Sequence, residues 1–330
     1  MPAVVDPELG PLTDDALTRD FRVWQRAKGH RFSSDDLATA YVAWHARPDA
    51  RRVLDLGCGL GSVLLHLAWK MPDAHFVGIE AQAMSFELLR RNVERAGVGG
   101  RVAIHHGDLR DEAAIAALGR DFELVTGTPP YFPPGHASDA MDEQRAYARI
   151  EYRGGVEAYL ATAARVLAPD GTVVMCGDAR AAERVERAAS DAKLAIHAIC
   201  EIIPREHEKP LFSIWTLGRV ERPLARSSMT LRDAAGERTR DDPKDSPGDH
   251  GPDGPIVTMR GMQISAGGKR IAWQRDAVDM FTFHLVVPPG WPQSEIRGQG
   301  PESRRITPNL MGVTWDHVAL YRAGYPTKDQ

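Results

Sequence analysis

A glycine-rich turn near residue 57 follows an apolar segment, and its residue types suit the binding of a small ligand. Residues 53–56 read Val-Leu-Asp-Leu, glycines follow at Gly57, Gly59 and Gly61, and a helical pattern of apolar residues begins at once. Alternate glycines let the backbone approach a ligand, and the next helix offers unpaired N–H groups. Asp55 would repel a phosphate, so the turn suits a ligand with a cationic amine. A turn without any ligand is the alternative.

Acidic residues also follow the next two predicted strands. Glu80 ends the apolar segment 75–79, and Asp108 with Leu109 follows the segment 102–105. In an open parallel sheet, ligands bind beyond the carboxyl ends of the strands. Glu80 can accept two hydrogen bonds from a diol, and Asp108 can accept one from an amino group. For each acid taken singly, a solvated turn residue is the alternative.

Two consecutive prolines follow the fourth predicted strand, 122–126. They make a rigid, extended turn without N–H groups of its own, so the preceding carbonyls stay free as acceptors. A planar amino group can donate to the Pro129 carbonyl and the Thr128 hydroxyl while Tyr131 stacks on its ring. We therefore predict that the catalytic residues are Thr128, Pro129, Pro130 and Tyr131. A proline-containing surface turn is the alternative.

The glycine turn with its acid resembles the S-adenosylmethionine (SAM) loop of class I methyltransferases. Its spacing is Gly-x-Gly-x-Gly, whereas dinucleotide folds use Gly-x-Gly-x-x-Gly. The proline turn resembles the (Asn/Asp)-Pro-Pro-(Tyr/Phe) motif of methyltransferases that act on exocyclic or amide nitrogens. The resemblance implies a SAM-dependent methyltransferase, with Glu80 on the ribose, Asp108 and Leu109 on the adenine, and Asp55 near the methionine ammonium. The implied cofactor-binding residues are Asp55, Gly57, Cys58, Gly59, Gly61, Glu80, Ala81, Asp108 and Leu109.

Residues 21–43 are similar to the segment that precedes the catalytic domain in the bacterial valine-tRNA adenine-N6 methyltransferases. The likeness rests on Gln25 and on the run 29–35, Gly-His-Arg-Phe-Ser-Ser-Asp, and it covers residues 21–220. It implies that Arg31, Asp35 and Phe132 bind the substrate, with the first two at the mouth shared with the cofactor. A helix cap is the alternative reading of Asp35 and the serine before it.

Thr128 departs from this family's pattern, which has asparagine at that position. Its hydroxyl can accept a hydrogen bond, but it is one bond shorter than asparagine and lacks the second donor. The first hypothesis is methyl transfer to adenine N6 in tRNA. The second is transfer to a protein glutamine amide or a small molecule, and the third is a SAM-binding module without catalysis that binds RNA or another partner.

Basic residues recur every four positions after the proline turn, at Arg145, Arg149 and Arg153. In a helix they would form one stripe able to hold phosphates. Nearby acids dilute this charge, so a solvated helix face is the alternative. His136 is a candidate general base or an ordinary surface residue.

The order of apolar segments predicts an α/β fold of the Rossmann-like methyltransferase type. Strands that alternate with helices indicate a mostly parallel sheet with helices on both faces, and two closing strands joined by a short turn are antiparallel. The seven strands are expected at 53–56, 75–79, 102–105, 122–126, 172–176, 194–203 and 211–217. We expect four regions: a leader and helix (1–50), the methyltransferase domain (51–220), a flexible linker (221–255) and a small β-rich appendage (256–330). Residues 1–20 read as a loose leader and 135–155 as a loop or lid.

Composition excludes several classes of function. A net charge of −4 gives no global attraction to nucleic acid, so any RNA-binding surface must be local. Three scattered cysteines are too few for a disulfide framework or a zinc site, which predicts no metal and a reducing cytoplasm. No window of 18 apolar residues occurs, so we expect a soluble protein that does not span a membrane.

Overall fold

The computed structural model describes residues 4–135 and 142–239, together with the backbone of five strands between residues 265 and 322. The chain divides into two compact units, Met1–Pro243 and Lys244–Gln330. All predicted site residues lie in the first unit.

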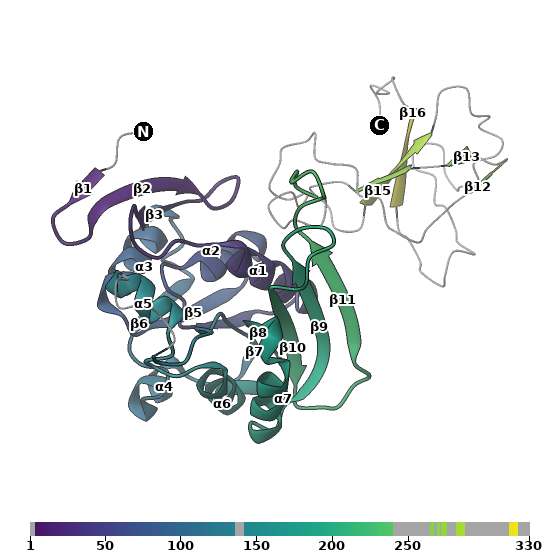
Figure 1. Ribbon diagram of the computed structural model, residues 1–330. Coiled ribbons are helices and arrows are strands. Elements are labelled where there is room, and N and C mark those ends of the chain that lie inside the picture. Colours follow the sequence, from purple (N-terminus) through teal and green to yellow (C-terminus); the bar gives the residue numbers. More distant parts are fainter. Residues whose placement is uncertain are drawn as a thin grey trace. The chain divides into compact units, whose positions relative to one another are not determined.

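An eight-stranded sheet forms the centre of the first unit (Figure 1). Its order is β11-β9-β10-β8-β7-β4-β5-β6. Only β10 runs antiparallel to its two neighbours, and all other pairs are parallel. The predicted mostly parallel sheet is therefore confirmed, with one more strand than expected. The strands are β4 (Arg52–Leu56), β5 (His75–Glu80), β6 (Val102–His106), β7 (Phe122–Gly127), β8 (Leu167–Asp178), β9 (Ala195–Ile203), β10 (Phe212–Gly218) and β11 (Ala225–Thr230).

Helices cover both faces of this sheet, as the alternating pattern predicts. One buried cluster joins the sheet to α1 (Ser34–Ala46), α2 (Ser62–Lys70) and α3 (Ala83–Arg95). A second cluster joins it to α4 (Glu112–Leu118), α6 (Val156–Val166) and α7 (Ala182–Asp191), which follows the short 3-10 helix η1 (Ala179–Ala181).

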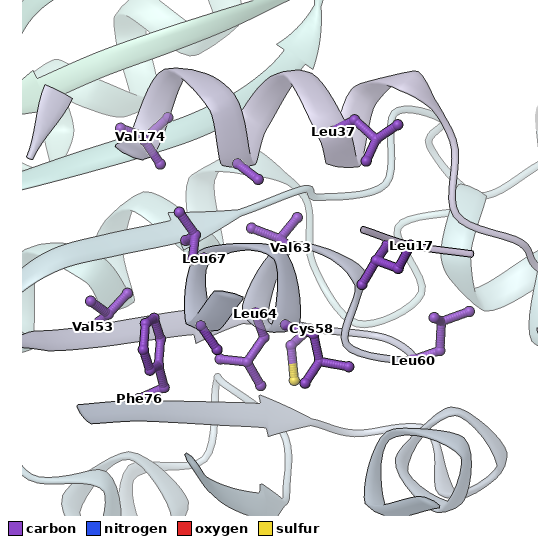
Figure 2. Packing of buried hydrophobic residues seen from close by; sticks show 14 of the residues in the cluster. Leu17, Leu37, Val53, Cys58, Leu60, Val63, Leu64, Leu67, Phe76 and Val174 are labelled. Carbon is purple, nitrogen blue, oxygen red and sulfur yellow. The ribbon is translucent and has the colours of Figure 1, made fainter. Parts of the chain in front are cut away.

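The strand before the glycine turn divides its side chains between the two faces. Val53 belongs to the cluster under α1 and α2, whereas Leu54 and Leu56 belong to the other cluster. Because side chains alternate along a strand, Asp55 shares the face of Val53. Figure 2 shows Leu64 and Leu67 of α2 beside Val53 on that face. Dense apolar packing on both faces therefore fixes the strand end from which the turn departs.

The predicted loose leader is wrong, because residues 4–26 form a three-stranded antiparallel sheet. Its strands are β1 (Val4–Asp6), β2 (Gly10–Ala16) and β3 (Arg22–Arg26). Leu9, Leu12 and Leu17 are buried in the main core. The neighbouring acids mask this apolar pattern in the sequence, and the structure pairs them with arginines. Asp14, for example, lies 2.9 Å from Arg95 of α3.

Two further segments are more ordered than expected. The predicted linker contains β11, which pairs in parallel with β9 and forms the edge of the main sheet. The predicted loop or lid contains the helix α5 (Glu143–Arg149), while residues 136–141 lie outside the described residues. In both segments, tertiary contacts order a polar stretch that has little apolar pattern of its own.

The second unit contains short strands. β14 (Ala272–Arg275) pairs with β15 (Thr282–Val287), which also pairs with β16 (His317–Arg322). These strands lie within residues 256–330, for which a small β-rich appendage is predicted. Its first apolar segment, 256–259, lies outside the described residues. A separate pair consists of β12 (Ser265–Ala266) and β13 (Lys269–Arg270). Among the helices that the structure describes, none has the length and apolar character needed to cross a bilayer.

A buried amide joins the N-terminal sheet to the glycine turn, and its removal should destabilise the fold. Asn92 accepts from the N–H of Trp24 at 2.7 Å and donates to the Leu60 carbonyl at 2.9 Å. Asn92→Leu would leave these buried backbone groups unpaired, so we expect the free energy of unfolding to fall by about 1–3 kcal/mol in urea titrations. Glu94→Gln, an exposed change on the same helix, is the control. A leucine variant as stable as the parent would show that this bridge contributes nothing.

Candidate active site

Two adjacent cavities lie at the carboxyl ends of the central strands. The first is lined by the glycine turn and by the ends of β5 and β6, and the second by the segment before α1, the proline turn and α5. Six residues line both cavities: His30, Phe32, Asp36, Thr128, Pro130 and Ala148. The sequence-predicted cofactor and substrate residues therefore divide between two neighbouring spaces that share a wall.

The three glycines of the turn all adopt positive φ angles, and two of them also have no room for a side chain. An added Cβ at Gly57 would lie 2.0 Å from the hydroxyl oxygen of Tyr159, and one at Gly61 would lie 2.7 Å from Leu89. A Cβ at Gly59 would meet no atom within 4 Å, although its φ of +56° also favours glycine. Gly57 and Gly59 line the first cavity, whereas Gly61 is the N-cap of α2. The open space beside Gly59 is where a ligand can approach the backbone.

Glu80 lies in the first cavity and is held from two sides. One carboxylate oxygen accepts from the Gly59 N–H at 2.9 Å, and the other accepts from the Gln82 N–H at 2.7 Å. Burial raises the pKa of this carboxyl above its usual value. Each oxygen keeps capacity for a second hydrogen bond, so the group can still receive a ligand diol. Ala81 and Cys58 line the same cavity, with the Cys58 side chain buried.

Asp108 and Leu109 also line the first cavity, as expected from their place after β6. The Arg110 guanidinium donates to both carboxylate oxygens of Asp108, at 3.0 and 2.7 Å, and this contact lowers the pKa of Asp108. The carboxylate is therefore ionised and fixed in position. Leu109 is buried beside it and supplies apolar surface for a planar ring.

Asp55 lines neither cavity, and its expected attraction of a ligand amine, directly or through water, stays a prediction. The side chain is buried on the face of β4 that α1 and α2 cover. One oxygen accepts from the Thr126 hydroxyl at 2.8 Å, and within the described part of the chain the other has no hydrogen-bond partner. Burial raises the pKa of Asp55 to about 7. The alternation of side chains along the strand directs this acid into the core, one residue before the turn.

The proline turn stands between the two cavities. Thr128 and Pro130 line both, whereas Pro129, Tyr131 and Phe132 line only the second. The Tyr131 hydroxyl lies 2.7 Å from the Cys176 sulfur and donates to Asp35 at 3.4 Å. Burial raises the pKa of Tyr131 well above its usual value, so the phenol is neutral.

Arg31 and Asp35 both line the second cavity, as the family resemblance implies. Arg31 is held by Asp15 at 3.0 Å and also donates to Thr13, so part of its charge is neutralised. The alternative helix cap is also present, although it uses a different acid. Asp36, rather than Asp35, accepts from the N–H of Ser33, at 3.0 Å, where α1 begins.

Sequence reasoning missed several lining residues. Asp36 faces both cavities, and burial raises its pKa well above the usual value. The Ser-x-x-Asp spacing could have revealed it as a cap, but not its proximity to a ligand. Tyr159 comes from α6 and packs against both Gly57 and Gly127. His30 lines both cavities, and only the fold brings it there.

The expected single stripe of arginines divides between the two cavities. Arg145 and Arg149 of α5 line the second cavity. Arg153 lies beyond the end of α5, lines the first cavity and stands over the Tyr147 ring at 4.5 Å. His136 falls outside the described residues. No cluster of three metal-ligating side chains occurs in residues 4–135 and 142–239.

A Rossmann-like sheet with a ligand cavity at the carboxyl ends of its strands is the architecture of class I methyltransferases. Residues 53–151 match the family model of the methyltransferase domain.

Curated relatives of this chain are methyltransferases with different named acceptors, and with the family match they show that the chain is a SAM-dependent methyltransferase. The tRNA1(Val) (adenine(37)-N6)-methyltransferase of Porphyromonas gingivalis is 27% identical over 210 residues, which cover 62% of this chain and 81% of the relative. The release factor glutamine methyltransferase of Chlorobaculum tepidum is 29% identical over 99 residues, 30% of this chain and 34% of the relative. A solved structure of a predicted O-methyltransferase from Agrobacterium tumefaciens has a TM-score of 0.47 and 18% identity, covering 63% of this chain and 92% of that one.

The raised pKa of Asp55 predicts a pH-dependent stability. The folded state holds this proton up to about pH 7, whereas an unfolded aspartate releases it near pH 3.9. Stability is therefore lost as the pH rises from about 4 to 7. Asp55→Asn removes the ionisation and keeps an oxygen for Thr126, so we expect it to be more stable than the parent at pH 8 and nearly equal at pH 4.5.

Urea titrations at the two pH values would measure this difference. A full shift of three pKa units corresponds to about 4 kcal/mol as an upper bound. An Asp55→Asn variant whose advantage is the same at both pH values would contradict the raised pKa.

Proposed function

We propose that this chain transfers the methyl group of SAM to the exocyclic N6 of an adenine in tRNA, and that it does so in the cytoplasm. The observation that carries the proposal is the position of Thr128 and Pro130 on the wall shared by the two cavities. An acceptor amine held at this wall from the second cavity would face the contents of the first. Three relatives that are named as valine-tRNA adenine-N6 methyltransferases support the choice of acceptor.

The residues of the first cavity fit SAM. The open space beside Gly59 admits a ligand to the backbone, Glu80 has acceptor capacity for the ribose diol, and Leu109 with Asp108 suits the adenine. When bound, SAM supplies an electrophilic methyl group on a sulfonium. Because such a displacement mainly needs orientation, the protein's task is to hold the acceptor in line.

The proline turn would hold the acceptor amine in line with the methyl group. The Pro129 carbonyl and the Thr128 hydroxyl accept hydrogens of the target amine, and the Tyr131 ring clamps its base. An aromatic amine is a poor nucleophile because its lone pair is delocalised into the ring. Acceptors that draw its hydrogens out of the ring plane restore nucleophilic character. The hydrogen bond from Tyr131 to Asp35 would keep the clamping ring in place.

The second cavity suits an unstacked base with its flanking phosphates. Arg145, Arg149 and Arg180 line it, and Phe132 and Leu211 are exposed at it, 38% and 55% respectively. No ion pair to Arg149 occurs within the described residues, so its charge is available to a phosphate. An exposed aromatic side chain such as Phe132 beside arginines is typical of surfaces on which a nucleic acid base stacks. Asp35, Asp36 and Asp178 line the same cavity, and Asp178 binds Arg180 at 2.7 Å, so the positive charge offered to a phosphate comes from Arg145 and Arg149.

A protein glutamine amide is the second candidate acceptor. One observation favours it: 99 residues resemble a release factor glutamine methyltransferase. A small-molecule amine would use the same turn. Loss of catalysis with retained SAM binding is the third hypothesis.

Transfer of radiolabelled methyl from SAM to total bacterial tRNA tests the proposal, with cell extract as a parallel acceptor. Label recovered as N6-methyladenosine after nuclease digestion is the expected result. Label only in protein or in small molecules would instead favour the second candidate. Tight SAM binding without any transfer would identify a non-catalytic module.

The role of Tyr131 gives a sharper prediction. Tyr131→Ala should lower kcat at least a hundredfold, whereas Tyr131→Phe, which keeps the ring, should retain transfer within a few-fold. Because Tyr131 lines only the second cavity, calorimetry should find that both variants bind S-adenosylhomocysteine within a few-fold of the parent. Equal loss of transfer and cofactor affinity in the alanine variant would show that the ring acts on the first cavity instead.

A further inference from the structure

A buried glutamine connects the two cavities. Gln144 is in the first turn of α5 and is 1% exposed. Its side-chain carbonyl accepts from the N–H of His30 at 3.2 Å, and its amide nitrogen donates to the Ser85 hydroxyl at 3.2 Å. It therefore joins α5 to α3 and to residues 28–33, which we call the strap.

The hydrogen bonds continue from Gln144 to the acid of the first cavity. The Ser85 hydroxyl donates to the Gln82 side-chain oxygen at 2.6 Å, and the Gln82 N–H donates to the Glu80 carboxylate at 2.7 Å. In this series of hydrogen bonds every donor points the same way, from the His30 N–H toward the Glu80 carboxylate. The Gln144 amide and the Ser85 hydroxyl each accept and donate, so the bonds on either side of them polarise one another. At Gln82 the side-chain oxygen accepts and the backbone N–H donates, so this residue passes on position rather than polarisation.

The backbone of the strap lies close to the Gln144 side chain. An added Cβ at Gly29 would lie 2.1 Å from the Gln144 oxygen, so the contact requires glycine there. Arg145, next on α5, donates to the Gly29 carbonyl at 3.3 Å. Arg26 binds both oxygens of Asp142, the N-cap of α5, at 2.9 Å. The strap and α5 are thus held together as one wall.

This wall belongs to the second cavity as well as to the first. The strap contributes Arg31 to the second cavity, and α5 contributes Arg145 and Arg149. At the other end of the hydrogen-bond chain, Glu80 and Ser85 line only the first. A ligand that fixes the Glu80 carboxylate would therefore also stabilise the wall against which the acceptor lies.

We propose that Gln144 is a positioning residue that couples SAM binding in the first cavity to the order of the strap and α5 in the second. The inference rests on Glu80 contacting the cofactor and is independent of which acceptor is methylated. Coupling of this kind is reciprocal, so an acceptor bound against the wall would in turn favour the cofactor. It makes cofactor binding the step that prepares the acceptor site.

Hydrogen exchange of the full chain with and without saturating S-adenosylhomocysteine tests the coupling without any methyl transfer. In the parent, the ligand should slow exchange about tenfold or more in three peptides, which cover residues 57–61, 28–33 and 143–149. In Gln144→Leu, which keeps the side-chain volume, the ligand should still slow exchange in the peptide 57–61. It should no longer slow exchange in the peptides 28–33 and 143–149. Affinity for the ligand should fall only a few-fold.

Two further variants make the experiment decisive. Ser85→Ala cuts the chain on the other side of Gln144 and should give the same pattern, with no additional effect in the double variant. Glu143→Gln, an exposed neighbour on α5, should behave as the parent. Slowing at residues 28–33 and 143–149 that survives in both single variants would overturn the proposal. The proposal would also be overturned if the variants lost the slowing of exchange at 57–61 to the same extent, because Gln144 would then only support ligand binding.

Discussion

The Glu80 carboxylate joins the ends of two neighbouring strands. By accepting from Gly59 and Gln82, it fixes the turn after β4 against the start of α3. A buried carboxylate tolerates its loss of water only when such donors are present. The first cavity takes its shape from this pair of contacts, and the hydrogen-bond chain through Ser85 to Gln144 extends them to α5.

Tyr159 imposes a second constraint on the same edge of the sheet. Its ring lies against the ends of β4 and β7 at positions where only glycine leaves room, Gly57 and Gly127. Burial and the nearby carboxylates raise the pKa of this phenol, so it remains neutral. The glycine turn is therefore shaped by the packing of α6 on one side and by the ligand space on the other. A pattern of glycines in a sequence does not distinguish these two causes.

The sequence was sufficient for features whose signals are local. Apolar runs with glycines or prolines at their ends predicted the strands, and the positions of Glu80, Asp108 and the proline turn at those ends predicted lining residues. The order of residues could not give the direction of a side chain, as for Asp55, which the strand turns into the core. Tertiary packing alone brings Tyr159 to the first cavity and joins Gln144 to the strap and to α3. Short strands with many charges, such as β2, carry too weak an alternation to be recognised.

The N-terminal sheet and the strap have a consequence for where the catalytic unit begins. The methyltransferase match starts at residue 53, yet His30, Phe32 and Asp36 line both cavities. The buried leucines of the N-terminal sheet also complete the core under α3. A protein shortened to the matched region would lose one side of each binding space and would present an uncovered apolar surface to water. The minimal enzyme is therefore larger than the sequence motif by which it is recognised.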